Sequence, residues 1–155
     1  MKQREAQGEI DLRYFDASGF CLVPYVPYAW QEQGDAITVP SDSHKKRLNV
    51  LGFLNRKNDL EAYTFEGRVD TNTVIACFDA FCRGLTTPTV VVLDNASMHT
   101  SKAFLAKIPE WQAQHVELFY LPPYSPELNS IEILWRFMKY EWIDLGAYKG
   151  WTYLV

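Results

Sequence analysis

Three acidic residues follow apolar or proline-rich segments and could together form a site for chemistry on phosphate groups. Asp16 follows an apolar stretch in YFDASGF, Asp94 ends the run VVVLD, and Glu132 follows the proline-rich segment LPPYSPELNSI. Clustered carboxylates raise each other's pKa unless a cation lies between them. Mg²⁺ takes one or two carboxylates plus waters and substrate phosphates, and two such ions can stabilise both reacting oxygens of a phosphodiester. The three residues therefore predict a metal-dependent phosphoryl-transfer site.

Hydrophobic periodicity and turn signals predict the elements that would position Asp16. The stretch GEIDLRYFDASGFCLVPYV is expected to form two strands joined at Ala17–Gly19, with the glycine as the turn signal. Residues 46–67 are expected to form a second hairpin that turns near Arg56–Asp59. Asp16 would then lie at the end of the first strand.

The second half of the chain alternates helices and strands. Apolar residues recur at helical spacing from Thr71 to about Gly84. TVVVLD is typical of a strand buried on both faces of a parallel sheet, and HVELFYL is predicted to be another strand. Helices are predicted in SKAFLAKIPEW, with Pro109 near its end, and from Ile131 to about Leu145, with Trp142 on the apolar stripe. These elements predict an α/β fold around a mixed sheet.

The composition is that of one globular domain. The chain has 155 residues, of which 48% are hydrophobic and 22% charged. The net charge of −4 argues against a protein whose whole surface binds nucleic acid, but not against a local basic patch or an acidic site filled by a divalent cation. The three cysteines have no zinc-site spacing and are expected to be reduced, as in a cytosolic protein. No apolar run has membrane-spanning length, and the polar first ten residues are not expected to act as a signal peptide.

Three segments together resemble the catalytic motifs of DDE-type transposases of bacterial insertion sequences in the mariner superfamily. They are FDASGF, VVVLDNASMHTSK and YLPPYSPELNSIEILWRFMK, and the resemblance extends over about residues 10–142. The third segment is long and unusual, so it carries most of the specificity. The resemblance implies a ribonuclease-H-like α/β fold, with a mixed sheet of five or more strands flanked by helices. It also implies that Asp16, Asp94 and Glu132 are the catalytic and metal-binding triad.

The same resemblance implies an enzyme that cuts DNA at transposon ends and joins the freed 3′-hydroxyl to target DNA. It implies two Mg²⁺ ions, for which Mn²⁺ can substitute, and double-stranded DNA partners, namely terminal repeats and target TA sites. Homo-oligomers on DNA and a place in the bacterial cytoplasm at the nucleoid are implied as well. Residues 1–155 are expected to be a single catalytic domain without the helix-turn-helix region usual in such enzymes. The alternatives are a ribonuclease-H-like nuclease without strand transfer, and a truncated remnant that only binds DNA or a partner.

Each acidic residue also has a structural interpretation. Asp94, followed by Asn95, could open an Asx turn. Asn129, three residues before Glu132, matches a capping pattern in which Asn129 caps the helix and Glu132 bonds back to the cap amide. Asn129 is expected to cap the helix even if Glu132 is a metal ligand. Three other acidic residues are alternatives to members of the triad: Asp11 and Asp35 to Asp16, and Glu127 to Glu132.

The approach to Glu132 is rich in proline. Pro122, Pro123 and Pro126 are expected to stiffen this segment, because proline fixes φ and lowers the entropy lost when a loop is ordered. A stiff approach favours a residue that must be aimed, such as a metal ligand, over a simple helix cap.

Basic residues and one histidine are candidates for contacts to DNA. The basic candidates are the cluster within HKKR and two residues on the helix face of Glu132: Lys45, Lys46, Arg47, Arg136 and Lys139. Arg136 could instead form an ion pair with Glu132, worth about 0.2–0.5 kcal/mol. His99, five residues after Asp94, is either a packing and hydrogen-bonding residue or a contact to the scissile phosphate.

Overall fold

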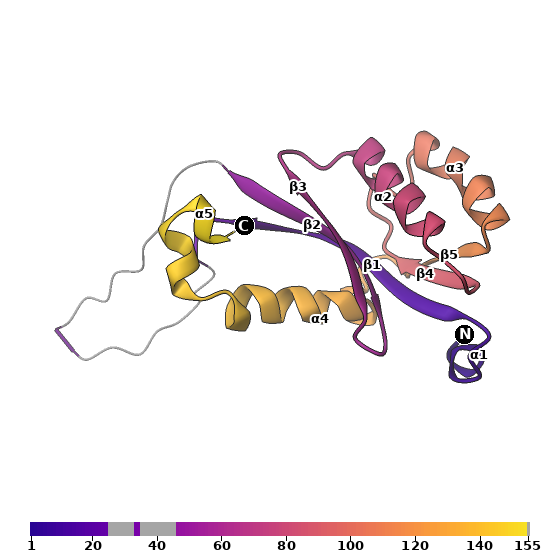
Figure 1. Ribbon diagram of the computed structural model, residues 1–155, viewed down its shortest axis with the longest axis horizontal. Helices are drawn as coiled ribbons and strands as arrows, with labels where there is room; N and C mark the ends of the chain where they lie inside the picture. The colour runs from indigo at the N-terminus through magenta and orange to yellow at the C-terminus, as the bar shows by residue number, and fades with distance from the viewer. Residues whose placement is uncertain (25–32, 35–45, 155) are drawn as a thin grey trace.

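The computed structural model describes residues 1–24, 33–34 and 46–154, so Lys45 and Asp35 lie outside the described part. A five-stranded sheet in the order β3-β2-β1-β4-β5 forms its centre (Figure 1). The pairs β1–β2 and β2–β3 are antiparallel, whereas β1–β4 and β4–β5 are parallel. The predicted α/β fold with a mixed sheet is confirmed. The strands are β1 (Asp11–Cys21), β2 (Arg47–Asn55), β3 (Leu60–Glu66), β4 (Thr89–Leu93) and β5 (Val116–Tyr120).

The first strand, β1, is continuous, so the predicted hairpin at Ala17–Gly19 is wrong. It has 11 residues and pairs with β2 along this stretch. The glycine serves a close approach instead of a turn, because a Cβ at position 19 would come within 1.9 Å of Nε of Arg47. The second predicted hairpin is confirmed, with β2 ending at Asn55 and β3 beginning at Leu60.

Helices cover both faces of the sheet (Figure 1). α2 (Thr71–Arg83) and α3 (Lys102–Ala113) pack together on one face, and α4 (Ser130–Phe137) contacts β1 and β2 on the other. No helix in the described part of the chain has the length and apolarity needed to cross a membrane. The remaining helical segments are α1 (Lys2–Ala6), the 3₁₀ segments η1 (Pro126–Leu128) and η3 (Leu145–Lys149), the π-helical η2 (Met138–Trp142), and α5 (Trp151–Leu154).

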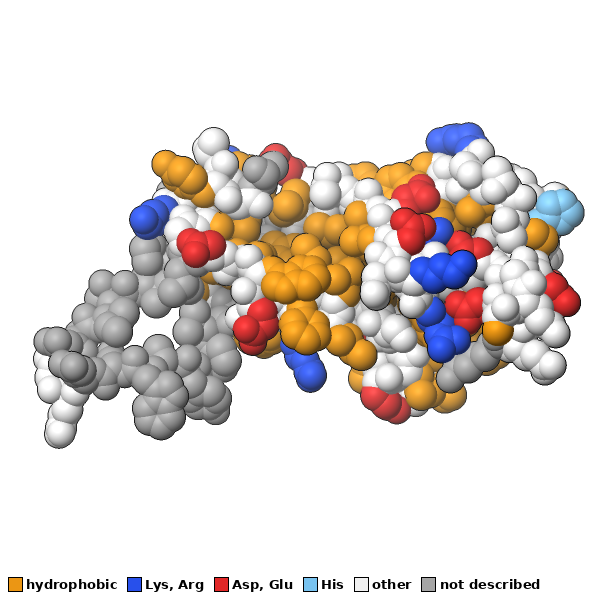
Figure 2. All heavy atoms as spheres, turned by 60° about the horizontal axis from the view of Figure 1, so that its bottom comes forward, with side chains coloured by type: hydrophobic (Ala, Val, Ile, Leu, Met, Phe, Trp, Pro, Cys, Tyr) orange, Lys and Arg blue, Asp and Glu red, His pale blue; other side chains and the backbone are white. Residues whose placement is uncertain are grey.

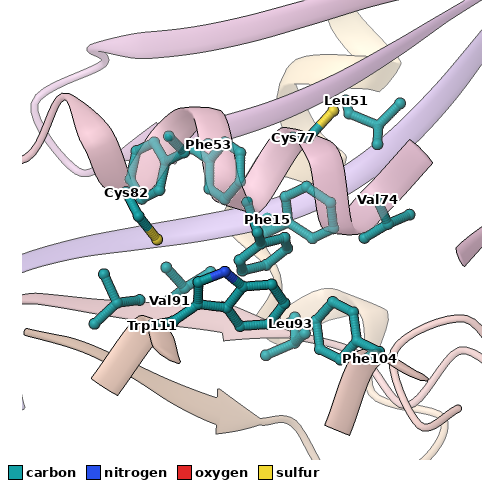
Figure 3. Close-up of a cluster of buried hydrophobic side chains, with 13 residues drawn as sticks. Phe15, Leu51, Phe53, Val74, Cys77, Cys82, Val91, Leu93, Phe104 and Trp111 are labelled. Atoms are coloured by element: carbon teal, nitrogen blue, oxygen red, sulfur yellow. The ribbon is translucent and has the colours of Figure 1, made fainter. Parts of the chain in front are cut away.

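Aromatic side chains fill the layer between the sheet and helices α2 and α3 (Figure 3). Phe53 of β2 stacks on Phe81 of α2, with ring centroids 3.9 Å apart. Trp111 of α3 is fully buried in the same layer. Burying each such side chain contributes about 1.5–3 kcal/mol, so this layer holds the sheet firmly. The strands that carry Asp16 and lead to Asp94 therefore contribute side chains to this buried layer.

Helix α4 packs on the opposite face of the sheet through Ile131 and Trp135, which are both buried. Gly52 of β2 makes room for the helix, since a Cβ there would come within 3.0 Å of both side chains. The outward side of α4 is also apolar, and Figure 2 shows hydrophobic side chains gathered over the middle of this face. Its exposed members include Ile133 and Phe137.

One predicted helix is confirmed and another is wrong in detail. The helix predicted in SKAFLAKIPEW is α3, with Pro109 four residues before its end at Ala113 and Trp111 buried in the last turn. α4 ends at Phe137 and gives way to the π-helical η2, which shifts the hydrogen bonding from four to five residues. Trp142 is consequently 64% exposed instead of lying on the buried stripe.

Candidate active site

Asp16 and Asp94 come level with each other on neighbouring parallel strands. The register pairs Tyr14 of β1 with Val92 of β4, and each aspartate lies two residues further along the chain. β4 ends at Leu93, whereas β1 continues beside β2 alone. The two aspartates therefore meet at the carboxyl end of β4, the kind of edge where α/β sheets place ligands. The sequence predicted Asp16 at the end of its strand. The structure places it in the middle of β1 instead.

Strand alternation directs Asp16 toward α4. Asp16 pairs with Gly52 in the antiparallel ladder, so the two residues share one face of the sheet. Gly52 lies beneath Ile131 and Trp135 of α4. Phe15, the preceding residue of β1, faces the core under α2 and α3. Asp16 is thus on the side of the sheet that the first turn of α4 covers.

Asn129 fastens the start of α4 to β1. Its Nδ2 donates to the carbonyl oxygen of Phe15 at 3.1 Å, and the residue is buried. Asn129 occupies the N-cap position, but its side chain does not cap the helix, so the predicted cap is wrong. Within the described residues the Glu132 carboxylate accepts no hydrogen bond, and only its backbone N–H bonds to the Asn129 carbonyl, at 3.0 Å. Asn129 therefore sets where α4 begins relative to Asp16.

Asp94 and Glu132 line one cleft of about 420 Å³ together with the segment between β5 and α4. The amide of Asn95 donates to the carbonyl oxygen of Leu121, and the Leu121 N–H donates to the carbonyl oxygen of Leu93. These bonds tie the wall of the cleft to the end of β4. Sequence reasoning treated Asn95 only as a turn residue and missed this role. Three exposed prolines of the wall also line the cleft: Pro122, Pro123 and Pro126.

The Asp16 carboxyl has a strongly perturbed environment. Burial is the main cause that raises its pKa, which reaches about 7, and the negative charges of Glu132 and then Asp94 add to the effect. A hydrogen bond from the Ala17 N–H and the proximity of His99 act in the opposite direction. The charges of Glu132 and Asp94 thus act on Asp16, the third residue predicted for the triad. A cation between them would remove the repulsion and favour the ionised form.

Asp94, by contrast, is held as an anion by its own loop. Nδ1 of His99 lies 2.7 Å from Oδ1 of Asp94, and this hydrogen bond is the main reason that the pKa of Asp94 is lowered. The Ala96 N–H donates to the same oxygen at 3.1 Å. The Asx turn considered from the sequence is therefore present. It occupies Oδ1 only, and nothing in the described part of the chain donates to Oδ2.

The His99 side chain is buried and hydrogen-bonded to Asp94. Its side chain is only 3% exposed and packs between the rings of Phe15 and Phe104. The Tyr120 hydroxyl donates to the His99 carbonyl oxygen at 2.8 Å. Nε2 is buried and has no hydrogen-bond partner among the described residues. This burial favours the packing and hydrogen-bonding interpretation of His99, and a contact to the scissile phosphate stays a prediction.

Two of the predicted basic residues lie close to the cleft. Arg136 and Lys139 line a groove along α4 that begins at Glu132. Arg136 is exposed, and the described residues include no ion pair between it and Glu132, so the predicted i,i+4 pair is not formed. The Lys139 ammonium lies 5.7 Å from the centre of the Phe20 ring.

The other basic candidates are remote from the carboxylates. Arg47 begins β2 and pairs with Cys21, which is five residues beyond Asp16 on β1 and about 17 Å along the strand. The Lys46 ammonium lies 5.5 Å from the Trp151 ring centre. A DNA contact at this end of the sheet stays a prediction.

The donor set suits a hard divalent cation, because it consists of carboxylate oxygens. The described ranges hold no group of three acidic, histidine or cysteine side chains already close enough to ligate one ion together. Mg²⁺ needs only one or two carboxylates and fills its remaining positions with waters and phosphate oxygens. A pair of aspartates with Glu132 alongside meets that requirement.

The sequence of the chain matches a known protein family. A family model described as DDE superfamily endonuclease matches residues 11–150. The chain belongs to the DDE superfamily endonucleases. The match begins with β1 and ends just after η3, so Asp16, Asp94 and Glu132 all lie inside it.

The endonuclease domain also resembles solved structures in fold. The Mos1 strand transfer complex matches 90% of this chain with a TM-score of 0.64 at 15% identity, and the Mos1 mariner paired end complex with Mn matches 90% with 0.60 at 15% identity. A simian T-cell lymphotropic virus intasome matches 81% with 0.52 at 12% identity. At these identities the likeness shows the fold, and it confirms the ribonuclease-H-like prediction.

This DDE endonuclease chain covers only part of the proteins that it resembles. It spans 44%, 46% and 36% of those three solved chains, respectively. The uncharacterized protein y4pE/y4sA of Sinorhizobium fredii (strain NBRC 101917 / NGR234) is 35% identical over 66 residues, which are 43% of this chain and 44% of that protein. The chain thus spans less than half the length of each of these relatives.

Replacing Asp16 with asparagine is expected to stabilise the protein when no divalent cation is present. The aspartate has a pKa near 4 when unfolded and about 7 when folded, so rising pH favours unfolding between these values. Above pH 7 the wild type carries the unfavourable charge and asparagine does not. The gain in the free energy of unfolding is up to about 4 kcal/mol. Urea unfolding in EDTA at pH 8 and pH 4 measures it.

At pH 4 the advantage of Asp16→Asn should nearly vanish, because the wild-type carboxyl is then mostly protonated in the folded state and asparagine removes little charge. Glu127→Gln is the matched control, since Glu127 is exposed and should change stability little at either pH. Equal stabilities of Asp16→Asn and wild type at pH 8 would contradict the account of this site.

Proposed function

We propose that this chain is the catalytic domain of a transposase, which cleaves DNA strands at transposon ends and transfers the freed 3′-hydroxyl to target DNA. Membership of the DDE superfamily endonucleases and the fold shared with Mos1 support the proposal. We also propose that residues 1–155 form one ribonuclease-H-like catalytic domain that works in the bacterial cytoplasm.

One observation carries the proposal. Asp16 is half-buried beside Asp94 and on the side of Glu132, and its partial burial together with these two charges raises its pKa. A fold maintained only for stability gains nothing from three carboxylates in mutual repulsion. A site that binds divalent cations and a phosphodiester does benefit from clustered carboxylates, because the cations neutralise the carboxylates and the phosphate together.

Asp16, Asp94 and Glu132 are proposed as the catalytic and metal-binding residues. The two aspartates would hold two ions, Mg²⁺ or Mn²⁺, and Glu132 would complete one of the sites; solved Mos1 complexes with Mn and with Mg support this choice. When bound, such ions provide Lewis-acid stabilisation of the attacking and leaving oxygens. The chain contributes position and charge: His99 orients Asp94, and Asp16 releases its proton as positive charge arrives.

Double-stranded DNA is proposed as the substrate, both as transposon terminal repeats and as target DNA at TA sites. Arg136 and Lys139 line the groove that leads from Glu132 along α4, where they would contact phosphates. Contacts that are local in this way are compatible with a net charge of −4. The paired-end description of Mos1 structures supports a homo-oligomer assembled on two DNA ends.

The proposal is tested by incubating the protein with plasmid and with a pre-cut oligonucleotide that ends in a 3′-hydroxyl, in Mg²⁺ or Mn²⁺. A transposase joins the oligonucleotide to the plasmid. Hydrolysis without joining would favour a ribonuclease-H-like nuclease. Binding without cleavage would favour a remnant that only binds DNA.

Asp94→Asn and Glu132→Gln are expected to abolish cleavage, because each removes a charged ligand while keeping the shape of the side chain. Glu127→Gln is the matched control, since this neighbouring exposed carboxylate lines the groove of Arg136 and Lys139 but not the cleft of Asp94, and its loss should not abolish cleavage. Cleavage rates and circular dichroism spectra are compared. Folded Asp94→Asn that still cuts DNA would rule out the triad.

Replacing His99 separates positioning from DNA contact. His99→Leu removes the donor to Asp94 and is expected to weaken Mn²⁺ binding and slow cleavage about 10–100-fold. His99→Asn keeps a donor near the place of Nδ1 and should recover much of the loss. DNA affinity without metal should be unchanged in both variants, because His99 is buried. A drop in metal-free DNA affinity with normal Mn²⁺ binding would instead indicate a phosphate contact.

A further inference from the structure

Tyr124 projects from the rim of the active-site cleft without packing against the protein. Its relative exposure is 101%, the highest among the large hydrophobic side chains in the described part of the chain. It nevertheless lines the same cleft as Asp94 and Glu132. Since the ring buries none of its surface, the stability of the fold does not account for an aromatic residue here.

The backbone at Tyr124 is also unusual. Its φ is 58°, in the left-handed region that glycine and asparagine adopt readily and a bulky aromatic residue does not. Neither the local conformation nor burial therefore favours tyrosine at this position. A non-glycine residue held in such a conformation beside an active site points to a role in binding.

The segment that carries Tyr124 is fixed at both ends. Leu121 is tied to the end of β4 through the carbonyl of Leu93 and the amide of Asn95, and Asn129 is tied to β1 through Phe15. Between these anchors, prolines restrict the backbone on either side of the tyrosine, and the Leu128 N–H closes a turn onto the Ser125 carbonyl at 3.1 Å. The backbone that carries the exposed ring is thus restricted before any ligand arrives.

We propose that Tyr124 is a base-stacking residue that holds an unpaired nucleobase next to the scissile phosphate. This inference rests on the proposed function, because DNA must occupy the cleft. Aromatic rings stack on any of the four bases, so such a contact needs no sequence recognition. A base inside an intact duplex offers no free face. Tyr124 therefore selects DNA that is frayed, flipped out or single-stranded at the cleavage position.

The test compares binding of two DNAs in Ca²⁺, which is used here to limit cleavage. One is a fully paired duplex, and the other is the same duplex with an unpaired 3′ overhang that contains 2-aminopurine. Wild type is expected to bind the overhang DNA roughly tenfold more tightly and to quench the 2-aminopurine fluorescence by stacking. Tyr124→Phe should keep both properties.

Tyr124→Asn is the decisive variant, because asparagine tolerates the left-handed backbone but has no ring. It should lose both the preference for the overhang and the quenching, with a melting temperature no lower than that of wild type. If Tyr124→Asn keeps both properties, or if wild type shows neither, the stacking role is overturned.

Plasmid cleavage by wild type in Mg²⁺, measured in parallel, keeps this inference apart from the proposed function. Cleavage without any stacking signal overturns only the role of Tyr124. A stacking signal that depends on Tyr124, without cleavage under any divalent cation, supports that role and contradicts the transposase proposal. Absence of both contradicts both.

Discussion

The hydrogen bond from the Asn129 amide to the carbonyl oxygen of Phe15 joins the two halves of the active site. The two residues are 114 positions apart, and each is next to or near a proposed metal ligand. Phe15 precedes Asp16 and is fixed by the aromatic core, whereas Asn129 precedes Glu132 by one helical turn. A small shift of α4 on the sheet would therefore separate Glu132 from Asp16. The packing of α4 over Gly52 supports the same placement.

The two aspartates are prepared for a cation in opposite ways. His99 and the Ala96 N–H keep Asp94 ionised, so it offers a charge from the start. Asp16 is half-buried near like charges, which raises its pKa, so it tends to keep its proton. Sites that act on charged ligands often contain such locally unfavourable groups, which the rest of the fold has to offset. If divalent cations bind as proposed, they would be both a cofactor and a stabilising ligand of the domain.

Local patterns in the sequence predicted much of the fold. The buried run before Asp94, the hairpin between β2 and β3, and the helix after Asp70 follow from periodicity and turn signals. The predictions that failed depend on contacts distant in sequence. The local sequence around Gly19 indicates a turn, but the glycine instead makes room for the Arg47 side chain of the next strand. His99 and Asn129 bond to the groups behind the site, and no local spacing could show that.

Anomalous scattering from Mn²⁺ in crystals of the protein tests the central claim most directly. The account predicts a Mn²⁺ peak between the carboxylates of Asp16 and Asp94, with Glu132 on the same side of the sheet. Diffraction data collected near the manganese absorption edge would locate the ion independently of any activity. A Mn²⁺-saturated crystal with an ordered cleft and no peak at the two aspartates would contradict the account.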